Sequence, residues 1–321
     1  MEYMEYNEKK NLIKIIKKIV LVIVIGILLN SYLTSPSKAY KALDSYFKKT
    51  YGEEFVIKGI GRRRLKDREW YEAGIVFPKS YIDTPKENDR YYWGRGFAEI
   101  EAFGFDVGDS YGGVLLNESA NEFYGKKLKE LFGDNVLPVL EIDGEYKFTD
   151  FVREYSRVSK TISGGIYIFG RVESDKDREW YRKQIYEFVQ FMKETGTFEY
   201  VALPINVLDK RVLSKEFQEN IELQQKLVDM GLKNKRKNVE IFRRERRRLM
   251  NELPKNLTPY VKLEEINKTE IRNSVKWSVY NNLLTTGIYS PKYVESNSLE
   301  EEYGIKNYDK LSDVSFTYEE Y

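Results

Sequence analysis

The segment Ile19–Leu29 reads IVLVIVIGILL and contains no polar side chain. Five lysines precede this apolar core, and a helix from Leu12 to Leu33 would measure about 33 Å, which is enough to span a bilayer. Positive charge on the N-terminal side of such a helix favours a cytoplasmic N-terminus. The sequence therefore predicts a single-pass membrane protein that contacts membrane lipid through residues 12–33 and exposes its remaining mass outside the cytoplasm.

A cleaved signal peptide is the alternative interpretation of the same segment. Its apolar core is short, and Ser37–Ala39 offers the small residues that a cleavage site requires. On this interpretation cleavage follows Ala39, and the mature protein begins at Tyr40 and is secreted.

Two residue types are absent, and their absence limits the chemistry of the chain. The 321 residues include no cysteine and no histidine. The chain therefore has no disulfide and no thiolate nucleophile, and it lacks the usual general base and the commonest transition-metal ligand. Its 53 basic and 51 acidic side chains almost balance, so no overall field attracts nucleic acid. We expect no cofactor, no metal site and no nucleic-acid partner.

Residues 36–145 are predicted to form an α+β domain with the order helix, three strands, helix, strand. The first helix ends at Tyr51, because apolar residues repeat at helical spacing up to that point and Gly52 follows. A capping-box pattern at Ser119–Glu122 introduces the second helix, and Asp106–Gly113 before it has the composition of a polar turn. The strands are expected within residues 55–61, 70–77, 91–103 and 136–142.

Residues 146–253 are predicted to form a β–α–β unit followed by helices. Strand-like runs at Gly164–Val172 and Phe198–Leu208 flank a helix that a second capping-box pattern, Ser174–Asp177, introduces. Pro204 has no backbone N–H group, which indicates that the returning strand lies at a sheet edge or a bulge.

The fold class that these patterns predict is α+β. Residues 1–35 hold a cytoplasmic tail and the transmembrane helix, two α+β units follow, and the C-terminal region is helical. Residues 254–321 are rich in tyrosine and glutamate, and we expect them to be partly disordered.

Two carboxylates are the candidate catalytic residues. Glu99 and Glu101 are two positions apart in a predicted strand, so they share one face of a sheet. Glycoside hydrolysis requires a pair of carboxylates. Charged residues on the solvent face of a half-buried sheet give the same pattern, and this is the simpler interpretation.

A basic helix is the second candidate site. The sequence from Lys233 to Arg248 reads KNKRKNVEIFRRERRR, and its arginines could contact an anionic surface such as lipid headgroups. The same pattern fits a solvated helix whose apolar residues pack inward. The candidate contact residues are Arg243, Arg244, Arg246, Arg247 and Arg248.

The N-terminal quarter of the chain resembles a group of bacterial proteins. A lysine-rich N-terminus, one apolar segment and a helix that ends in Tyr51-Gly-Glu-Glu-Phe55, followed by strands, resemble uncharacterised single-span surface proteins of low-GC bacteria. The resemblance implies an extracytoplasmic domain of the cystatin-like or NTF2-like type, and it transfers no catalytic residues.

The predicted function is that of a membrane-anchored binding or scaffolding protein of the bacterial cell surface, without catalysis. One alternative is an enzyme of the cell envelope that acts on glycans through Glu99 and Glu101. A second alternative is a subunit that docks onto a protein partner at the membrane through the basic helix.

Overall fold

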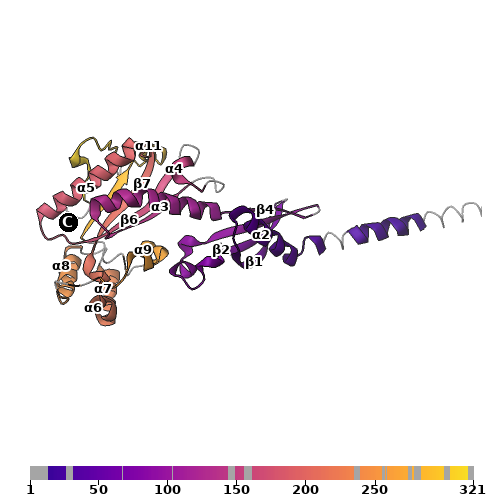
Figure 1. Cartoon of the computed structure of the whole chain (residues 1–321), viewed down its shortest axis with the longest axis horizontal. Coiled ribbons are helices and arrows are strands. Elements are labelled where there is room, and N and C mark those ends of the chain that lie inside the picture. The colour runs from indigo at the N-terminus through magenta and orange to yellow at the C-terminus, as the bar shows by residue number, and fades with distance from the viewer. Residues whose placement is uncertain are drawn as a thin grey trace, which may run out of the picture. The chain divides into compact units, whose positions relative to one another are not determined.

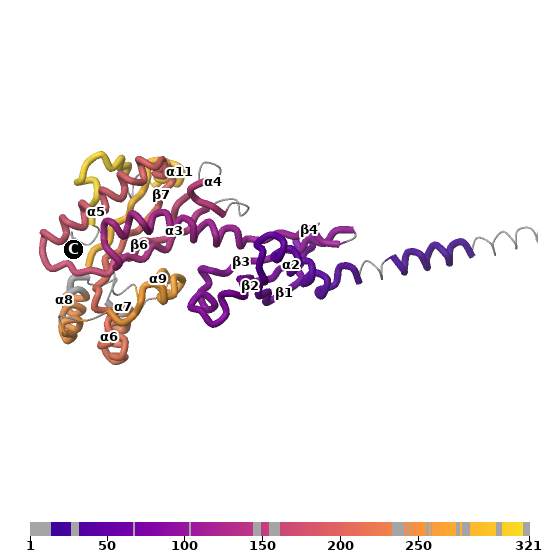
Figure 2. The backbone as a smooth tube through the Cα atoms, viewed as in Figure 1, coloured from indigo at the N-terminus to yellow at the C-terminus, as the bar shows by residue number. Residues whose placement is uncertain are grey.

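The structure is a computed structural model that describes residues 14–26, 32–66, 68–102, 104–143, 149–154, 161–234, 239–254, 257, 259–273, 277, 283–299 and 304–316. These residues form an α+β fold with two four-stranded sheets, and the chain divides into two compact units (Figures 1 and 2). The first unit comprises the chain up to Ile82 together with Trp93–Tyr111. The second comprises Asp83–Tyr92 and the chain from Gly112 onward.

The predicted transmembrane helix is wrong, because no described helix is both long and apolar enough to cross a membrane. The N-terminal helix is described over residues 14–26, about 20 Å, whereas the hydrocarbon core of a bilayer is roughly 30 Å thick. Lysines occupy three of its first five positions. This finding contradicts the predictions of a single-pass signal-anchor protein at the cell membrane. Residues 12–13 and 27–31 of the predicted span lie outside the described residues.

The alternative cleavage site falls inside a helix rather than in an extended segment. Helix α2 (Pro36–Tyr51) begins with a proline at its first position, and Ala39 in its first turn is fully buried. The helix ends at Tyr51 as predicted, because Gly52 adopts a left-handed conformation (φ 75°) and its N–H donates to the carbonyl of Lys48.

The first unit is an antiparallel sheet against which α2 packs. Its strands follow chain order, and β4 is an addition to the three predicted strands. Leu43 and Phe47 of α2 lie so close to Gly96 that a side chain there would collide with both. The strands are β1 (Phe55–Leu65), β2 (Arg68–Pro78), β3 (Gly94–Glu101) and β4 (Gly104–Asp109).

The second unit is built on a mixed sheet with the order β5-β6-β7-β8. Its strands are β5 (Val136–Ile142), β6 (Thr161–Gly170), β7 (Tyr200–Asp209) and β8 (Leu284–Tyr289). Strands β6 and β7 pair in parallel through helix α5 (Asp175–Glu194), which confirms the predicted β–α–β unit. Ser174 and Asp177 form the predicted capping box at the start of α5.

Helices cover both faces of this sheet. Figure 1 shows α3 (Tyr111–Phe132) and α5 on one side, and several shorter helices on the other. The shorter helices are α6 (Lys215–Glu219), α7 (Ile221–Asn234), α8 (Val239–Met250) and α9 (Lys268–Asn273). The remaining short elements are η1 (Lys79–Tyr81), η2 (Pro85–Asn88), η3 (Arg90–Tyr92), α4 (Phe151–Glu154), η4 (Lys210–Leu213), η5 (Leu263–Glu265), α11 (Pro291–Ser296) and η6 (Leu311–Asp313).

The core of the second unit lies between the sheet and helices α3 and α5. Leu116, Ala120, Tyr124 and Leu128 of α3 are buried at intervals of four residues, so one stripe of the helix faces the sheet. Aliphatic residues from all four strands and the apolar face of α5 complete the cluster. This packing leaves the opposite stripe of α3 available for contacts outside the core.

Pro204 lies in an interior strand that keeps its register, which contradicts its predicted position at an edge or a bulge. Strand β7 is flanked by β6 and β8, and Pro204 pairs with Gly287 of β8. The parallel pairing of β6 with β7 is interrupted between Ile162↔Val201 and Ile166↔Ile205, without a change of register. The missing N–H group of Pro204 falls within this interruption, so the interior strand tolerates the proline.

Candidate functional site

A cavity of about 620 Å³ lies in the second unit beside strand β5. We call it the Lys268 pocket. Four lysines line it together with an apolar wall, and the contributing elements are η2, η3, α3, β5, η5 and α9. Its lining residues are Lys86, Tyr92, Asn121, Glu122, Gly125, Lys126, Lys129, Asp134, Val136, Leu137, Pro138, Leu263, Glu264 and Lys268.

Side chains from α3 and η3 fasten the outer edge of β5, which forms one wall of the pocket. Asn121 accepts from the N–H of Leu140 at 3.0 Å and donates to the hydroxyl of Tyr91 at 2.5 Å. The same hydroxyl donates to the carbonyl of Leu140 at 2.5 Å. Backbone groups at the edge of a sheet are a template for unwanted pairing unless they are covered, and these contacts cover them.

Asp89 fixes the start of α9 against η3. Its carboxylate is buried and accepts from the N–H groups of Lys268 (2.6 Å) and Thr269 (3.1 Å) and from the Thr269 hydroxyl (2.6 Å). It also accepts from the N–H of Tyr91 at 3.0 Å. One carboxylate therefore sets the position of Lys268 relative to the two tyrosines of η3.

The Lys268 ammonium lies over aromatic rings instead of beside a carboxylate. Its Nζ is 4.6 Å from the ring centroid of Tyr91 and 5.1 Å from that of Tyr92. Among the residues that the structure describes, no hydrogen bond or ion pair of Nζ is found. Burial, reinforced by the nearby charge of Lys86, lowers the pKa of Lys268 to about 8. Perturbed lysines in clefts are typical of functional sites.

The other three lysines of the pocket each have an acidic partner. Lys86 contacts Glu118 at 2.5 Å and also lies 4.7 Å from the Tyr92 ring centroid. Lys126 pairs with Glu122 at 3.1 Å, and Lys129 lies 3.9 Å from Asp134. Lys268 is therefore the lysine of this pocket that forms no ion pair with a described residue.

Replacing Lys268 by methionine is expected to stabilise the fold by about 1 kcal/mol below pH 8, because the variant no longer places an ammonium group in a partly buried position. The folded chain binds fewer protons than the unfolded chain between the lowered pKa of about 8 and the ordinary 10.5, so the wild type gains stability as the pH rises through this range. The difference between variant and wild type therefore shrinks towards pH 10.5. Urea unfolding at pH 7 and pH 10 measures both values, and a less stable variant at pH 7 would contradict the expectation.

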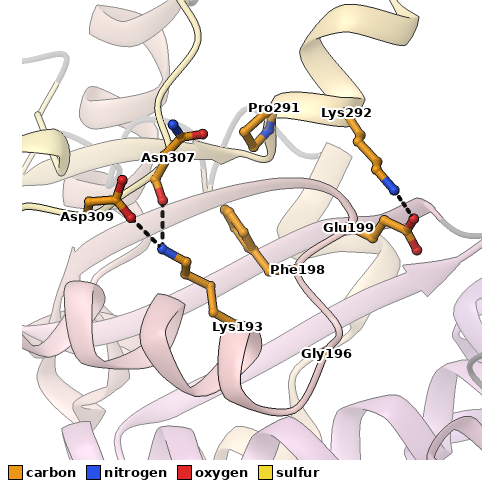
Figure 3. Close-up of a pocket in the computed structure, with 8 residues that line it drawn as sticks. All are labelled: Lys193, Gly196, Phe198, Glu199, Pro291, Lys292, Asn307 and Asp309. Carbon is orange, nitrogen blue, oxygen red and sulfur yellow. Dashed lines mark hydrogen bonds and ion pairs between the residues drawn. The ribbon is translucent and has the colours of Figure 1, made fainter.

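A second pocket of about 590 Å³ in the same unit has its lysines already paired (Figure 3). Lys193 donates to the carbonyl of Asn307 at 3.0 Å and contacts Asp309 at 2.9 Å. Lys292 pairs with Glu199 on the other side of Phe198. Because these charges balance within the pocket, it offers an apolar surface around Phe198 without an unsatisfied ion.

The two candidate catalytic carboxylates lie on β3, where Glu99 is engaged by an arginine. Arg68 contacts both carboxylate oxygens of Glu99, with its Nε at 2.7 Å from Oε1. This bidentate contact lowers the pKa of Glu99, so the group stays ionised, whereas a glycosidase needs one carboxyl with a raised pKa as its acid. Glu101 is exposed where β3 ends. Glu99 and Glu101 therefore have the surroundings of charged residues on the solvent-facing side of a sheet.

The basic helix does not present all its arginines to one surface. Arg246 is buried, with 1% of its surface exposed, because it lies on the same face of α8 as buried Phe242 and Leu249. Arg244, Arg247 and Arg248 are exposed, and Arg248 contacts Glu245 at 2.9 Å. The side chain of Arg243 lies outside the described residues.

Comparison with known proteins adds little to this description. No protein-family model matches the chain, and no curated protein does. The chain is similar to a solved structure, a DUF5037 family protein from Ruminococcus gnavus ATCC 29149, with 13% sequence identity and a TM-score of 0.33. The alignment covers 77% of this chain and 90% of that chain. A similarity of this size carries no argument about function, and the resemblance of the N-terminal quarter to single-span surface proteins stays a prediction.

Proposed function

We propose that the chain is a binding protein that takes a small organic anion, of the monocarboxylate class, in the Lys268 pocket. The position of Lys268 supports this proposal. A partly buried cation without an ion pair is destabilised by the water that it loses, and contact with aromatic rings offsets only part of that cost. An anionic ligand would supply the direct ion pair that Lys268 does not form with a described residue.

The lining of the pocket favours a ligand with one charge and an apolar body. Three of the four lysines form ion pairs with acidic side chains, and Lys268 is the lysine that remains to contact the carboxylate of a ligand. Val136, Leu137 and Tyr92 are almost fully buried apolar residues of the wall, and Pro138 and Leu263 extend it. Pockets of this size and character commonly hold small organic molecules that a few polar groups orient.

Thermal unfolding with matched ligand pairs tests the proposal. Phenylacetate, indole-3-acetate and hexanoate are expected to raise the melting temperature of the full chain, whereas their primary amides, which lack the charge, are expected to have no effect. The shift is expected to vanish in Lys268→Met, which removes the charge and keeps an apolar side chain.

Lys215→Met is the matched control, because Lys215 is an exposed lysine on α6 that pairs with Glu219 outside the pocket. It is expected to keep the full response to carboxylates. If no carboxylate shifts the wild type, or if Lys268→Met responds like the wild type, the proposal is wrong.

A further inference from the structure

We infer that Lys268 is a nucleophilic amine that captures a 2-oxo acid as a Schiff base in its pocket. This inference rests on the proposed function, in which the pocket binds the carboxylate of the ligand. It adds a reaction between Lys268 and the ketone carbonyl that is next to this carboxylate in a 2-oxo acid. Three observations support it. The Lys268 Nζ lies over the rings of Tyr91 and Tyr92, the pocket provides space beside it, and the ammonium of Lys86 also lies over the Tyr92 ring.

The two tyrosine rings hold the amine in one place without forming an ion pair with it. Nζ lies 4.6 Å and 5.1 Å from the ring centroids, and Asp89 fixes the backbone of Lys268 by accepting its N–H. A lysine paired with a carboxylate is held in its protonated form, which has no lone pair for attack. The aromatic contact also favours the ammonium, but by less than an ion pair with a carboxylate does.

The surroundings also shift the amine towards its neutral form. Burial is the largest cause and the charge of Lys86 acts in the same direction, whereas Glu118 and Asp89 oppose them. At pH 7.5 an amine with a pKa of about 8 is neutral in about one molecule in four, against about one in a thousand for an ordinary lysine. The charged and titratable groups around Lys268 are Glu118 of α3, Lys86 of η2, Asp89 between η2 and η3, Tyr91 and Tyr92 of η3, and Glu264 of η5.

The reaction balances without an oxidant or a reductant. The lone pair of neutral Nζ attacks the carbonyl carbon, a C–N bond forms, and the carbonyl π electrons move to oxygen. The two protons of Nζ leave with this oxygen as water, and a C=N bond remains. One further proton from solvent gives an iminium ion, whose positive charge lies next to the carboxylate of the captured 2-oxo acid. The product therefore supplies the ion pair that Lys268 does not form with a described residue.

Reductive trapping tests this inference on the full chain. The protein is incubated with pyruvate and sodium cyanoborohydride, which reduces a Schiff base to a stable secondary amine, and peptide mapping by mass spectrometry measures the occupancy of each lysine. At pH 7.5, Lys268 is expected to be labelled about tenfold or more above Lys215, because its neutral fraction is far higher. This preference is expected to be lost at pH 10.5, where ordinary lysines are also half neutral.

Lys268 labelled no more than Lys215 at pH 7.5 would overturn the inference. The failure of the inference and the failure of the proposed function are distinguishable. If carboxylates raise the melting temperature in a Lys268-dependent manner but pyruvate does not label Lys268, the binding function stands and covalent capture is wrong. If acetone, which has the ketone of pyruvate but no carboxylate, labels Lys268 as fast as pyruvate and carboxylates give no thermal shift, the carboxylate function is wrong, and with it the choice of a 2-oxo acid.

Discussion

Arg211→Met is expected to reduce the free energy of unfolding by about 3–5 kcal/mol, because it leaves a buried carboxylate without its cation. Arg211 and Asp209 are both almost fully buried, and the guanidinium contacts both carboxylate oxygens, with NH2 at 2.7 Å from Oδ2. Its NH1 group also donates to the carbonyl of Met250 at 2.7 Å, near the end of α8. The arginine therefore joins the end of β7 to the end of helix α8.

Urea unfolding measures this cost through the transition midpoint at an unchanged slope. In the double variant Asp209→Leu with Arg211→Met, most of the loss is expected to be recovered, since replacing a whole buried ion pair by apolar residues is often neutral. About 1 kcal/mol should remain lost, because Asp209 also accepts from the N–H of Arg211 at the start of η4.

A solvent-exposed pair provides the matched control for this measurement. Lys215 and Glu219 lie 3.6 Å apart with most of both side chains exposed. Lys215→Met is expected to change the stability by less than about 0.5 kcal/mol. If Arg211→Met costs no more than this control, Asp209 and Arg211 are not the buried pair that the structure shows.

Local sequence signals predicted the elements that local interactions stabilise. Helix α5 begins directly after Ser174, because the side chains of Ser174 and Asp177 each accept a hydrogen bond from the other's backbone N–H group. The flanking strands carry continuous apolar runs that a buried parallel pair requires. The β–α–β unit was therefore visible in the sequence.

Other elements depend on partners that are distant in the chain. The pattern at Ser119–Glu122 predicted a helix start, but α3 begins at Tyr111, and the Ser119 hydroxyl accepts from the N–H of Phe151 instead. The composition of Asp106–Gly113 predicts a polar turn, whereas its first residues belong to strand β4, in which Phe105 and Val107 alternate with small or charged residues. The register that places β4 against β3 is a tertiary property, so the short run alone could not decide it.

The candidate site was missed for the same physical reason. Lys268 and the two tyrosines beneath it are about 180 positions apart in the sequence, and neither segment carries a recognised motif. Arg246 shows the opposite error, because a run of arginines indicated an exposed surface while the packing of α8 buries one of them. Patterns of charge identify residues that can interact, but only the fold shows which charges are left without a partner.

Asp89→Ala is expected to destabilise the chain by about 2–4 kcal/mol and to abolish the response to carboxylates. The variant leaves the N–H groups of Tyr91, Lys268 and Thr269 without their acceptor in a buried place, and unsatisfied buried donors cost about 1–3 kcal/mol each before the structure relaxes. The attachment of α9 to η3 should loosen, so Lys268 should lose its fixed position over the rings. Urea unfolding and the thermal response to phenylacetate measure the two effects separately.

Thr269→Val separates the role of this carboxylate from a general loss of packing. It removes the hydroxyl that donates to Asp89 at 2.6 Å and leaves all the backbone contacts of Asp89 in place, so we expect a cost of about 1 kcal/mol and a preserved response to carboxylates. If Asp89→Ala is as stable as Thr269→Val and still responds to phenylacetate, Asp89 does not hold Lys268 in position. If Asp89→Ala loses stability and response together while Thr269→Val keeps the response, one buried carboxylate both supports the fold and orients the amine, because the same hydrogen bonds serve both.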